Sequence, residues 1–322
     1  MPKGVYKYMN REQFEIRTDL ALEVREDIEK KGEELKGVRV SEEERYGGEI
    51  RITTVSIETE EAARTMRKEK GKYLTIEVPF VRWEGEEEQE LVAGVVADYI
   101  RKVLGKEERK SVLVVGLGNR DVTPDALGPQ IIDNLCVNRH LIGDGRRQNM
   151  ISAVAPGVMA QTGIETAVLV KGIVAETKPT AVIALDALAA RNIHRLNTTI
   201  QLSDAGISPG SGVGNHRHAL NKGSLGVPVI AIGIPTVVDA ATIVNDTMNR
   251  LVEAINSYEG DTFCGGYEML TEEERRMLVY ELFTPEWRGM FVTPKNVDET
   301  INNMSITLAK AICYALLGKN RS

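Results

Sequence analysis

Cysteines are few in this sequence, and long apolar runs are missing. The three cysteines, Cys136, Cys264 and Cys313, stand far apart and never approach CxxC spacing, which argues against a disulfide framework and a cysteine-rich zinc site. No apolar run reaches the ~18 residues of a membrane span, and the N-terminus lacks the apolar middle of a signal peptide. We therefore expect reduced thiols, no membrane association and a cytoplasmic protein.

A surplus of positive charge is also absent. Lys and Arg number 40 against 47 Asp and Glu, so the formal net charge is −7, which is the wrong sign for a protein that blankets nucleic acid. Hydrophobic residues make up 42% and charged residues 27% of the 322 residues, as is typical of an ordinary soluble protein. At ~100–200 residues per domain, the chain holds one large domain or two smaller ones.

Apolar runs alternate with amphipathic segments, which indicates an α/β protein. We predict a mostly parallel sheet flanked by helices, with additional strands from the N-terminal region. Residues 1–49 are strongly charged, so the core is expected to begin after Gly48. Strands are expected at 50–58, 72–80, 111–119 and 198–204, a strand followed by a carboxylate within 180–190, and a strand running into a helix at 227–244. Helices are expected at 86–105, 125–138, 161–177, 269–282 and 297–318.

The candidate functional residues are the polar ones that follow the apolar runs, because ligands of open α/β sheets bind beyond the carboxyl ends of the strands. Three segments supply them. GLGNRDVTPDALGP contains Asn119, Asp121 and Asp125; ALDALAAR contains Asp186 and Arg191; DAGISPGSGVGNHRH contains Asp204, His216, Arg217 and His218.

Gly116 and Gly118 form half of a dinucleotide-binding fingerprint. Asp121 stands where the third glycine belongs, and no strand ending in an acidic residue follows about 20 residues later, so NAD binding is disfavoured. The GxxxxGK[ST] and HExxH patterns are absent. Zincin chemistry is therefore disfavoured as well.

Asp125 and Asp186 each have a structural and a functional interpretation. Asp125 is either a favourable charge in the first turn of a helix capped by Thr123, with Pro124 as its first residue, or a functional group. Asp186 directly follows the apolar AVIAL, where a buried strand is expected to end, and is either an N-cap or a group that faces the crevice. If the two strands are neighbours, the carboxylates converge and share a proton. Such a pair can activate water and protonate a leaving group.

Asn119, Arg191 and His216 are candidates for supporting roles. Asn119 lies in the same loop as Asp125. Arg191 either lies one helical turn from Asp186 and holds an acidic substrate group, or is a surface helix charge. His216 is either a solvated loop residue or completes a metal site with the two carboxylates, although nothing in the spacing demands a metal.

Five phrases, in order along essentially the whole chain, carry a resemblance to a known family. They are FEIRTDLALE, VVGLGNRDVTPDALGP, AVAPGVMAQTGIET, ALDALAAR and DAGISPGSGVGNHR. The sequence resembles the germination protease of spore-forming bacteria, the endopeptidase that degrades small acid-soluble spore proteins. The resemblance implies an atypical aspartic-type protease without DTG or DSG motifs, and a core similar to the hydrogenase maturation proteases, of the phosphorylase-hydrolase-like kind. It also implies that Asp125 and Asp186 are the catalytic pair.

The same resemblance implies a zymogen that removes its own N-terminal propeptide. Because substrates of this family are cut after a glutamate that precedes an apolar residue, we predict cleavage between Glu15 and Ile16. Arg17 departs from the small residue usual at that position, and the alternative is that 1–15 is merely a frayed terminus. The predicted organisation is a 1–15 propeptide and a 16–322 protease domain. That domain comprises an N-terminal extension (16–85), a catalytic core (86–258) and C-terminal helices (259–322).

The resemblance further implies a homotetramer in the cytoplasm of the spore core, with spore proteins as substrates, no cofactor, no metal and no direct contact with nucleic acid. Two rival hypotheses stay open. One is a metal-dependent maturation-type protease with Asp125, Asp186 and His216 as ligands, which a chelator would inhibit. The other is a nucleotide- or phosphate-binding module that uses GLGN and SPGSGVGN as phosphate loops, which nucleotides or phosphate would stabilise.

Overall fold

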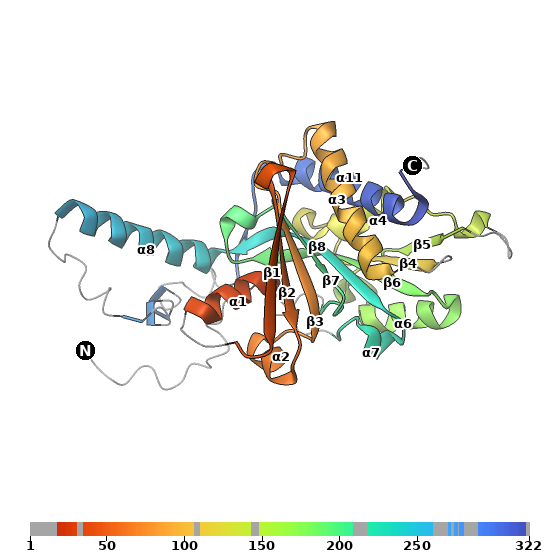
Figure 1. Ribbon diagram of the computed structural model, residues 1–322, viewed down its shortest axis with the longest axis horizontal. Coiled ribbons are helices and arrows are strands. Elements are labelled where there is room, and N and C mark those ends of the chain that lie inside the picture. The colour runs from red at the N-terminus through yellow and green to blue at the C-terminus, as the bar shows by residue number, and fades with distance from the viewer. Residues whose placement is uncertain are drawn as a thin grey trace.

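The computed structural model describes residues 18–30, 35–105, 110–142, 148–208, 218–259 and 289–319, with short stretches at 270–271, 274–275 and 277–279. These residues form a β-sheet with helices on both faces (Figure 1). Among the helices of these ranges, none has the length and apolarity that crossing a membrane requires. The expected α/β class is confirmed.

Nine strands make up the sheet within the described residues, in the order β1-β2-β3-β7-β8-β6-β4-β5, with β9 paired to β8. In chain order the strands are β1 Val38–Arg45, β2 Ile50–Ile57, β3 Gly71–Glu77, β4 Ser111–Gly116, β5 Met150–Val154, β6 Ala181–Ala190, β7 Thr199–Ser203, β8 Val229–Asp239 and β9 Phe291–Val292. Strands β5, β4, β6 and β8 are parallel neighbours, whereas every other pairing is antiparallel.

The sheet is therefore mixed, which corrects the expectation of a mostly parallel one. The reversal occurs at β7, which is antiparallel to both β3 and β8. Only residues 191–198 separate β7 from β6, and this connection is shorter than the dozen or more residues that a parallel crossover needs. The N-terminal strands β1 to β3 extend the sheet from β7 outward.

The helices follow the amphipathic pattern of the sequence. They are α1 Ala21–Lys30, α2 Glu60–Met66, α3 Glu86–Leu104, α4 Leu127–Asp133, α5 Met159–Thr162, α6 Thr166–Thr177, α7 Lys222–Leu225, α8 Ala240–Glu259 and α11 Val297–Leu317. Short 3₁₀ turns are η2 Tyr46–Gly48, η3 Thr123–Asp125, η4 Arg139–Leu141 and η5 Ile193–Arg195. Helices α3 and α11 match their expected ranges to within one residue. The expected helix at 269–282 falls largely outside the described residues.

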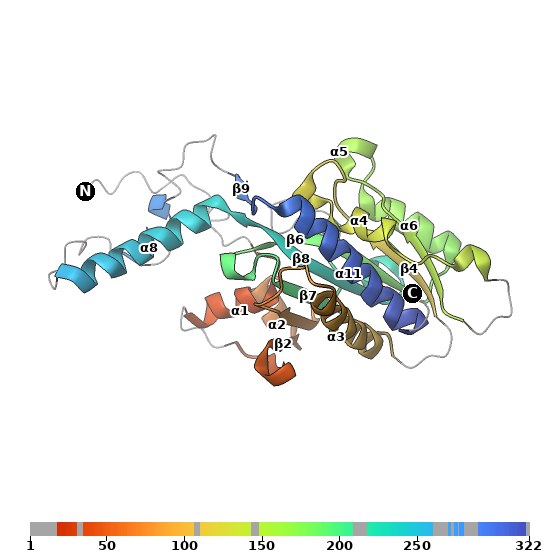
Figure 2. The ribbon, with the colours of Figure 1, turned by 90° about the horizontal axis from the view of Figure 1, so that it is seen from above.

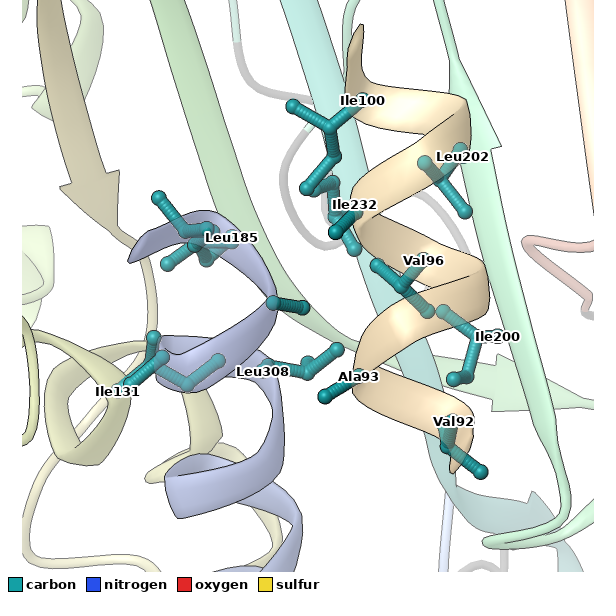
Figure 3. Packing of buried hydrophobic residues seen from close by; sticks show 14 of the residues in the cluster. Val92, Ala93, Val96, Ile100, Ile131, Leu185, Ile200, Leu202, Ile232 and Leu308 are labelled. Atoms are coloured by element: carbon teal, nitrogen blue, oxygen red, sulfur yellow. The ribbon is translucent and has the colours of Figure 1, made fainter. Parts of the chain in front are cut away.

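One face of the sheet is covered by α3, α4 and α11, which enclose the largest apolar cluster. Figure 3 shows the packing, in which Ala93 of α3 lies next to Leu308 of α11, while Val92, Val96 and Ile100 belong to the same cluster. Acidic residues fill the first turn of α3 and basic residues its last turn, so the helix dipole also favours this helix. The opposite face is covered by α6 and α7 over the parallel strands and by α1 and α2 over β2 and β3.

The expectation that the core begins after Gly48 is wrong. Leu20 and Ala21, at the start of α1, are fully buried, and Leu22 and Ile28 belong to the core as well. The charged composition of this segment conceals its role, because its acidic residues Glu23 and Asp27 are themselves buried against cations supplied by the β6–β7 connection. Strand β1 and strand β5 were also not expected.

Two predicted helices are shorter than the sequence pattern suggests. The segment 125–138 forms the turn η3 and then the short α4, which ends at Asp133. The segment 161–177 breaks at Gly163, which has a left-handed φ of 69° and ends α5 before α6 starts. Glycine is the residue that adopts this conformation without strain. The break places α5 at the carboxyl edge of the parallel strands.

Candidate active site

The loop that follows β4 holds Asp125 through its backbone. The amide of Asn119 donates to Oδ2 of Asp125 at 2.7 Å, and the hydroxyl of Thr236 on β8 donates to the carbonyl of Pro124 at 2.7 Å. Val122, not Thr123, precedes the turn η3 as its N-cap, and it makes no side-chain capping bond. The alternative in which Thr123 caps a helix beginning at Pro124 is therefore wrong, and Asp125 closes a 3₁₀ turn.

Asp186 lies inside β6 and not beyond its end, which corrects the sequence expectation. β6 continues to Ala190 because its neighbour β8 is long enough to pair with it throughout, with Asp186 opposite Gly233. The other neighbour, β4, ends at Gly116 opposite Leu185. Asp186 is thus the first residue of β6 beyond the end of β4. Its side chain is buried, at 6% exposure, and its Oδ1 accepts from the amide of Ala187 at 3.0 Å.

The segments that carry the two aspartates meet at one edge of the sheet. The amide of Leu117, just after β4, donates to the carbonyl of Leu185, just before Asp186, at 2.8 Å. A Cβ added at Gly128 in α4 would lie 2.2 Å from the carbonyl oxygen of Leu117 and 2.8 Å from that of Leu185. The start of α4 therefore packs directly on both strands, and η3 contacts β6 and β8. The turn that ends at Asp125 and the strand that contains Asp186 therefore meet at the carboxyl edge of the parallel strands.

Asn119 has a second role, which involves a residue that sequence reasoning missed. Its side-chain oxygen accepts from the amide of Asp121 at 3.0 Å and from Nε2 of Gln161 at 2.8 Å. The same Nε2 of Gln161 also donates to Oδ2 of Asp121 at 2.9 Å. Gln161 thus ties α5 to the Asp125 loop. Nothing in the local pattern around Gln161 marks it, because its partners lie 40 and 42 residues earlier.

Arg191 lies on no helix, so neither of its two interpretations is correct as stated. It follows β6 directly. Arg191 therefore does not lie one helical turn from Asp186, because the residues between them form a strand. The Arg191 guanidinium contacts Asp27 of α1 at 3.4 Å, and the Arg191 amide donates to Glu23 at 2.7 Å. Both side chains of the Arg191–Asp27 pair are largely buried. Arg191 fastens α1 to the end of β6.

Sequence comparisons identify relatives along nearly the whole chain. The family described as Germination protease matches residues 15–258. The chain is 45% identical to the Germination protease of Caldanaerobacter subterraneus subsp. tengcongensis, with 94% of each chain covered. It is 43% identical to that of Clostridium acetobutylicum, with 94% of this chain and 95% of the relative covered, and 42% identical to that of Bacillus subtilis, with 94% of each covered.

This chain belongs to the germination protease family. The family membership makes it a hydrolase of the peptidase class and links it to spore germination. The resemblance predicted from the five sequence phrases is thereby confirmed. Within the fold of this peptidase, the edge that carries Asp125 and Asp186 is the candidate active site.

Several predicted residues lie outside the described part of the chain, namely Glu15, Ile16, His216 and Arg217. The next described residue, His218, contacts Glu165, with its Nδ1 at 2.5 Å from Oε1 and its amide donating to the same oxygen at 2.8 Å. Glu165 ends the turn between α5 and α6. Among the described ranges, no group of three or more His, Cys, Asp and Glu side chains is arranged to hold a metal ion. This finding does not cover His216, which lies outside those ranges.

Proposed function

We propose that this germination protease family member is an endopeptidase that initiates the degradation of small acid-soluble spore proteins, cutting after glutamate with Asp125 and Asp186 as its catalytic carboxylate pair. The observation that carries the proposal is the hydrogen bond from Leu117 to Leu185. This bond joins the chain segments that present the two aspartates. The supporting comparison is the family match, which spans both residues.

In this mechanism the two carboxylates share one proton, because two like charges at short range do not both ionise. One carboxylate removes a proton from water as the water attacks the scissile carbonyl, and the other protonates the leaving amine. The Asn119 amide orients Asp125, and the Ala187 amide orients Asp186. Both donors are main-chain groups of ordered loops or strands, so the carboxylates are held in place before substrate binds.

The test is cleavage of a peptide with a Glu–Ile bond, followed by mass spectrometry. Asp125→Asn and Asp186→Asn should each lower the rate by about 10²-fold or more, because general acid–base groups contribute about 10²–10⁴-fold. Asp133→Asn is the matched control, since Asp133 is an exposed carboxylate of α4 that pairs with Arg120. Near-wild-type cleavage by either catalytic variant, with an unchanged circular dichroism spectrum, would refute the assignment.

A chelator arm of the same assay separates the carboxylate mechanism from a metal-dependent one. We expect cleavage to persist after incubation with a chelator. Loss of cleavage in chelator and its return on addition of a divalent metal would instead favour the metal-dependent alternative with His216 as a third ligand.

We further propose that the chain is made as a zymogen and removes residues 1–15 by itself. The sequence supplies the Glu15–Ile16 bond, which matches the preference proposed for the substrates. Intact-mass measurement should show loss of residues 1–15 from wild-type protein and no such loss from Asp186→Asn. Processing of purified Asp186→Asn at the wild-type rate would contradict self-cleavage by this site.

A homotetramer in the spore core completes the proposal, with spore proteins as the partners and no direct contact with nucleic acid. Support for self-association comes from α8, which extends away from the sheet (Figures 1 and 2). Its Val244, Met248 and Leu251 are 38%, 36% and 50% exposed, and they fall on one helical face by their spacing. Light scattering should give four times the chain mass, and Leu251→Glu should lower it.

A further inference from the structure

Strand β6 loses one of its neighbours part-way along its length. In a parallel sheet, the amide and carbonyl of one residue face the same neighbouring strand, and those of the next residue face the other. The amide of Val182 donates to Pro228 beside β8, and the carbonyl of Leu185 accepts from Leu117 beyond β4. The odd-numbered residues of β6 therefore turn their backbone groups toward the β4 side. Beyond Leu185, β4 no longer covers that side.

The far end of this uncovered side is occupied by the N-terminal segment. The amide of Asp19 donates to the carbonyl of Ala189 at 2.9 Å, and the amide of Ala189 donates to Oδ2 of Asp19 at 2.9 Å. Gln201 and Lys68 hold the carbonyl of Asp19 in turn, at 3.0 and 2.9 Å. Both backbone groups of Ala189 are thus satisfied by a segment fixed to neighbouring elements.

Ala187 lies between these two covered positions. Its amide bonds only to the side chain of the preceding residue, Asp186, and no hydrogen bond to its carbonyl is found within the described residues. Ala187 is also the single residue of β6 that is not buried. A backbone carbonyl without a partner is uncommon in a central strand, and here it adjoins the proposed catalytic carboxylate.

We propose that the uncovered edge of β6 at Ala187 is the binding site for the extended backbone of a protein substrate. The substrate would add a short strand between Leu117 and Asp19, in the manner of peptides that extend a sheet edge. Leu185 and Ala189 are four residue steps apart, which at ~3.3 Å per residue spans about 13 Å of edge. This length accepts the few residues around a scissile bond and places them beside Asp186. The inference rests on the proposed protease function.

Substrate binding at this edge also changes the surroundings of Asp186. The Ala187 amide, which now donates to Oδ1 of Asp186, would donate to a substrate carbonyl instead. The Ala187 carbonyl would accept from a substrate amide. Docking would thereby release one oxygen of the Asp186 carboxylate from its main-chain bond at the moment when the scissile peptide arrives.

Backbone recognition is tested by replacing single peptide amides with esters, which remove one N–H at a time. The probe is a fluorescent peptide with the sequence of residues 9–17, MNREQFEIR, in which the Glu–Ile amide is reduced to an uncleavable methylene amine. Its binding to the full chain is followed by fluorescence anisotropy. An ester at one position, or at either of two positions separated by one residue, should weaken binding about five- to tenfold, as loss of a single hydrogen bond does. Esters at all other positions should change the affinity by less than about twofold.

Ala187→Pro assigns the effect to the proposed edge, because proline lacks the amide donor and is tolerated where a strand edge is uncovered. It should weaken the unmodified probe about five- to tenfold. The penalty of the sensitive ester should shrink in this variant, because the two groups act in one short pairing. Asp133→Asn, which changes an exposed carboxylate of α4, is the control and should bind as the wild type does. The ester series on the wild type stands alone if Ala187→Pro does not fold.

The proposal is overturned if the unmodified probe does not bind, if every ester analogue binds within about twofold, or if a folded Ala187→Pro leaves the ester penalty unchanged. Cleavage of the ordinary peptide is measured in parallel. Cleavage without any position-dependent ester effect would reject the docking edge and leave the protease function intact. A position-dependent ester effect without cleavage would support the edge and reject the protease function.

Discussion

The main-chain amide of Asn119 lies 2.7 Å from Oδ2 of Asp125, and the residue before Asn119 makes this close approach possible. Gly118 has a φ of +114°, and a Cβ placed on it would lie 1.9 Å from the carbonyl oxygen of Asp125. No side chain fits there without moving the turn η3. The orientation of the proposed catalytic carboxylate therefore depends on a glycine that carries no functional group of its own.

Gly118→Ala should displace Asp125 and impair both activity and folding. We expect peptide cleavage to fall about 10²-fold, the effect of misplacing a catalytic group by about 1 Å, and the free energy of unfolding to fall by at least about 2 kcal/mol. The measurements are cleavage rate and urea unfolding. Gly226→Ala is the control, because Gly226 also has a positive φ, of +75°, but an added Cβ would meet nothing within 4 Å.

The control should lose only about 1 kcal/mol of stability, the cost of a left-handed conformation, and should cleave the peptide normally. Equal effects of the two alanine substitutions on cleavage would contradict the steric argument, since both share the backbone conformation and only Gly118 adjoins Asp125.

Gln161→Leu should reduce activity with little change in stability. The variant loses the hydrogen bonds to Asn119 and Asp121, so α5 is no longer tied to the Asp125 loop. Because these bonds are exposed, we expect an unfolding free energy within about 0.5 kcal/mol of the wild type. We expect a loss in kcat/KM of roughly 2–10-fold, corresponding to about 0.5–1.5 kcal/mol. Steady-state kinetics and denaturant unfolding measure the two quantities.

Gln161→Lys provides a rescue test, since lysine keeps donors at this position and places a cation beside Asp121. It should recover most of the kcat/KM lost in Gln161→Leu. Wild-type kcat/KM in Gln161→Leu would show that the bridge from α5 does not position the loop. An equal loss in both variants would show that a donor at this position is not what the loop requires.

The sequence predicts the central strands and both aspartates because these features are local. An apolar run that stops at a polar residue is visible in one dimension, and β4 with its loop and β6 with Asp186 both have that form. The continuation of β6 past Asp186 is not local. It depends on β8, which pairs with β6 as far as Ala190, so the length of one strand is decided by its neighbour. Gln161 escaped prediction for the same reason.

The N-terminal helix escaped prediction because composition misleads there. A run of charges ordinarily indicates a solvated surface, yet Glu23 is only 2% exposed. Its carboxylate accepts from the amides of Arg191 at 2.7 Å and Asn192 at 2.9 Å, and lies 3.5 Å from the Arg195 guanidinium. Burial opposes the charge on Arg195, but the hydrogen bonds that its guanidinium donates to Glu26 and Glu77, together with nearby carboxylate charges, raise its pKa. Partners distant in sequence thus make a charged helix part of the interior.

Glu23→Ala should be strongly destabilising. It leaves two main-chain amides and a largely buried arginine short of an acceptor, and breaking a buried ionic network of this kind costs about 3 kcal/mol or more. Glu29→Ala on the same helix is the control, since the Glu29–Arg25 pair is an exposed i,i+4 contact worth less than about 0.5 kcal/mol. Urea unfolding compares them. Similar losses in the two variants would show that Glu23 acts as an ordinary surface charge.

The contact between α3 and α11 should weaken in acid through Glu90. Its carboxylate accepts from Lys310 Nζ at 2.9 Å and from the Tyr314 hydroxyl at 2.9 Å. The Lys310 hydrogen bond, followed by that of Tyr314, lowers the pKa of Glu90 from its ordinary value of 4.5. A carboxyl group with a lowered pKa in the folded state stabilises the protein above its unfolded pKa, and loses that effect as the pH falls through the folded pKa.

Glu90→Gln should therefore cost about 0.5–1 kcal/mol at neutral pH, a modest value because both partners are partly exposed. The difference from the wild type should persist down to the ordinary pKa of 4.5 and shrink below it, because the wild-type carboxylate then becomes protonated. Urea unfolding between about pH 7 and pH 3 measures this difference. Glu87→Gln, in the first turn of the same helix, is the control and should change the free energy of unfolding by less than about 0.5 kcal/mol. If the difference in unfolding free energy between Glu90→Gln and the wild type stays constant into acid, the ionised carboxylate of Glu90 is not what joins α3 to α11.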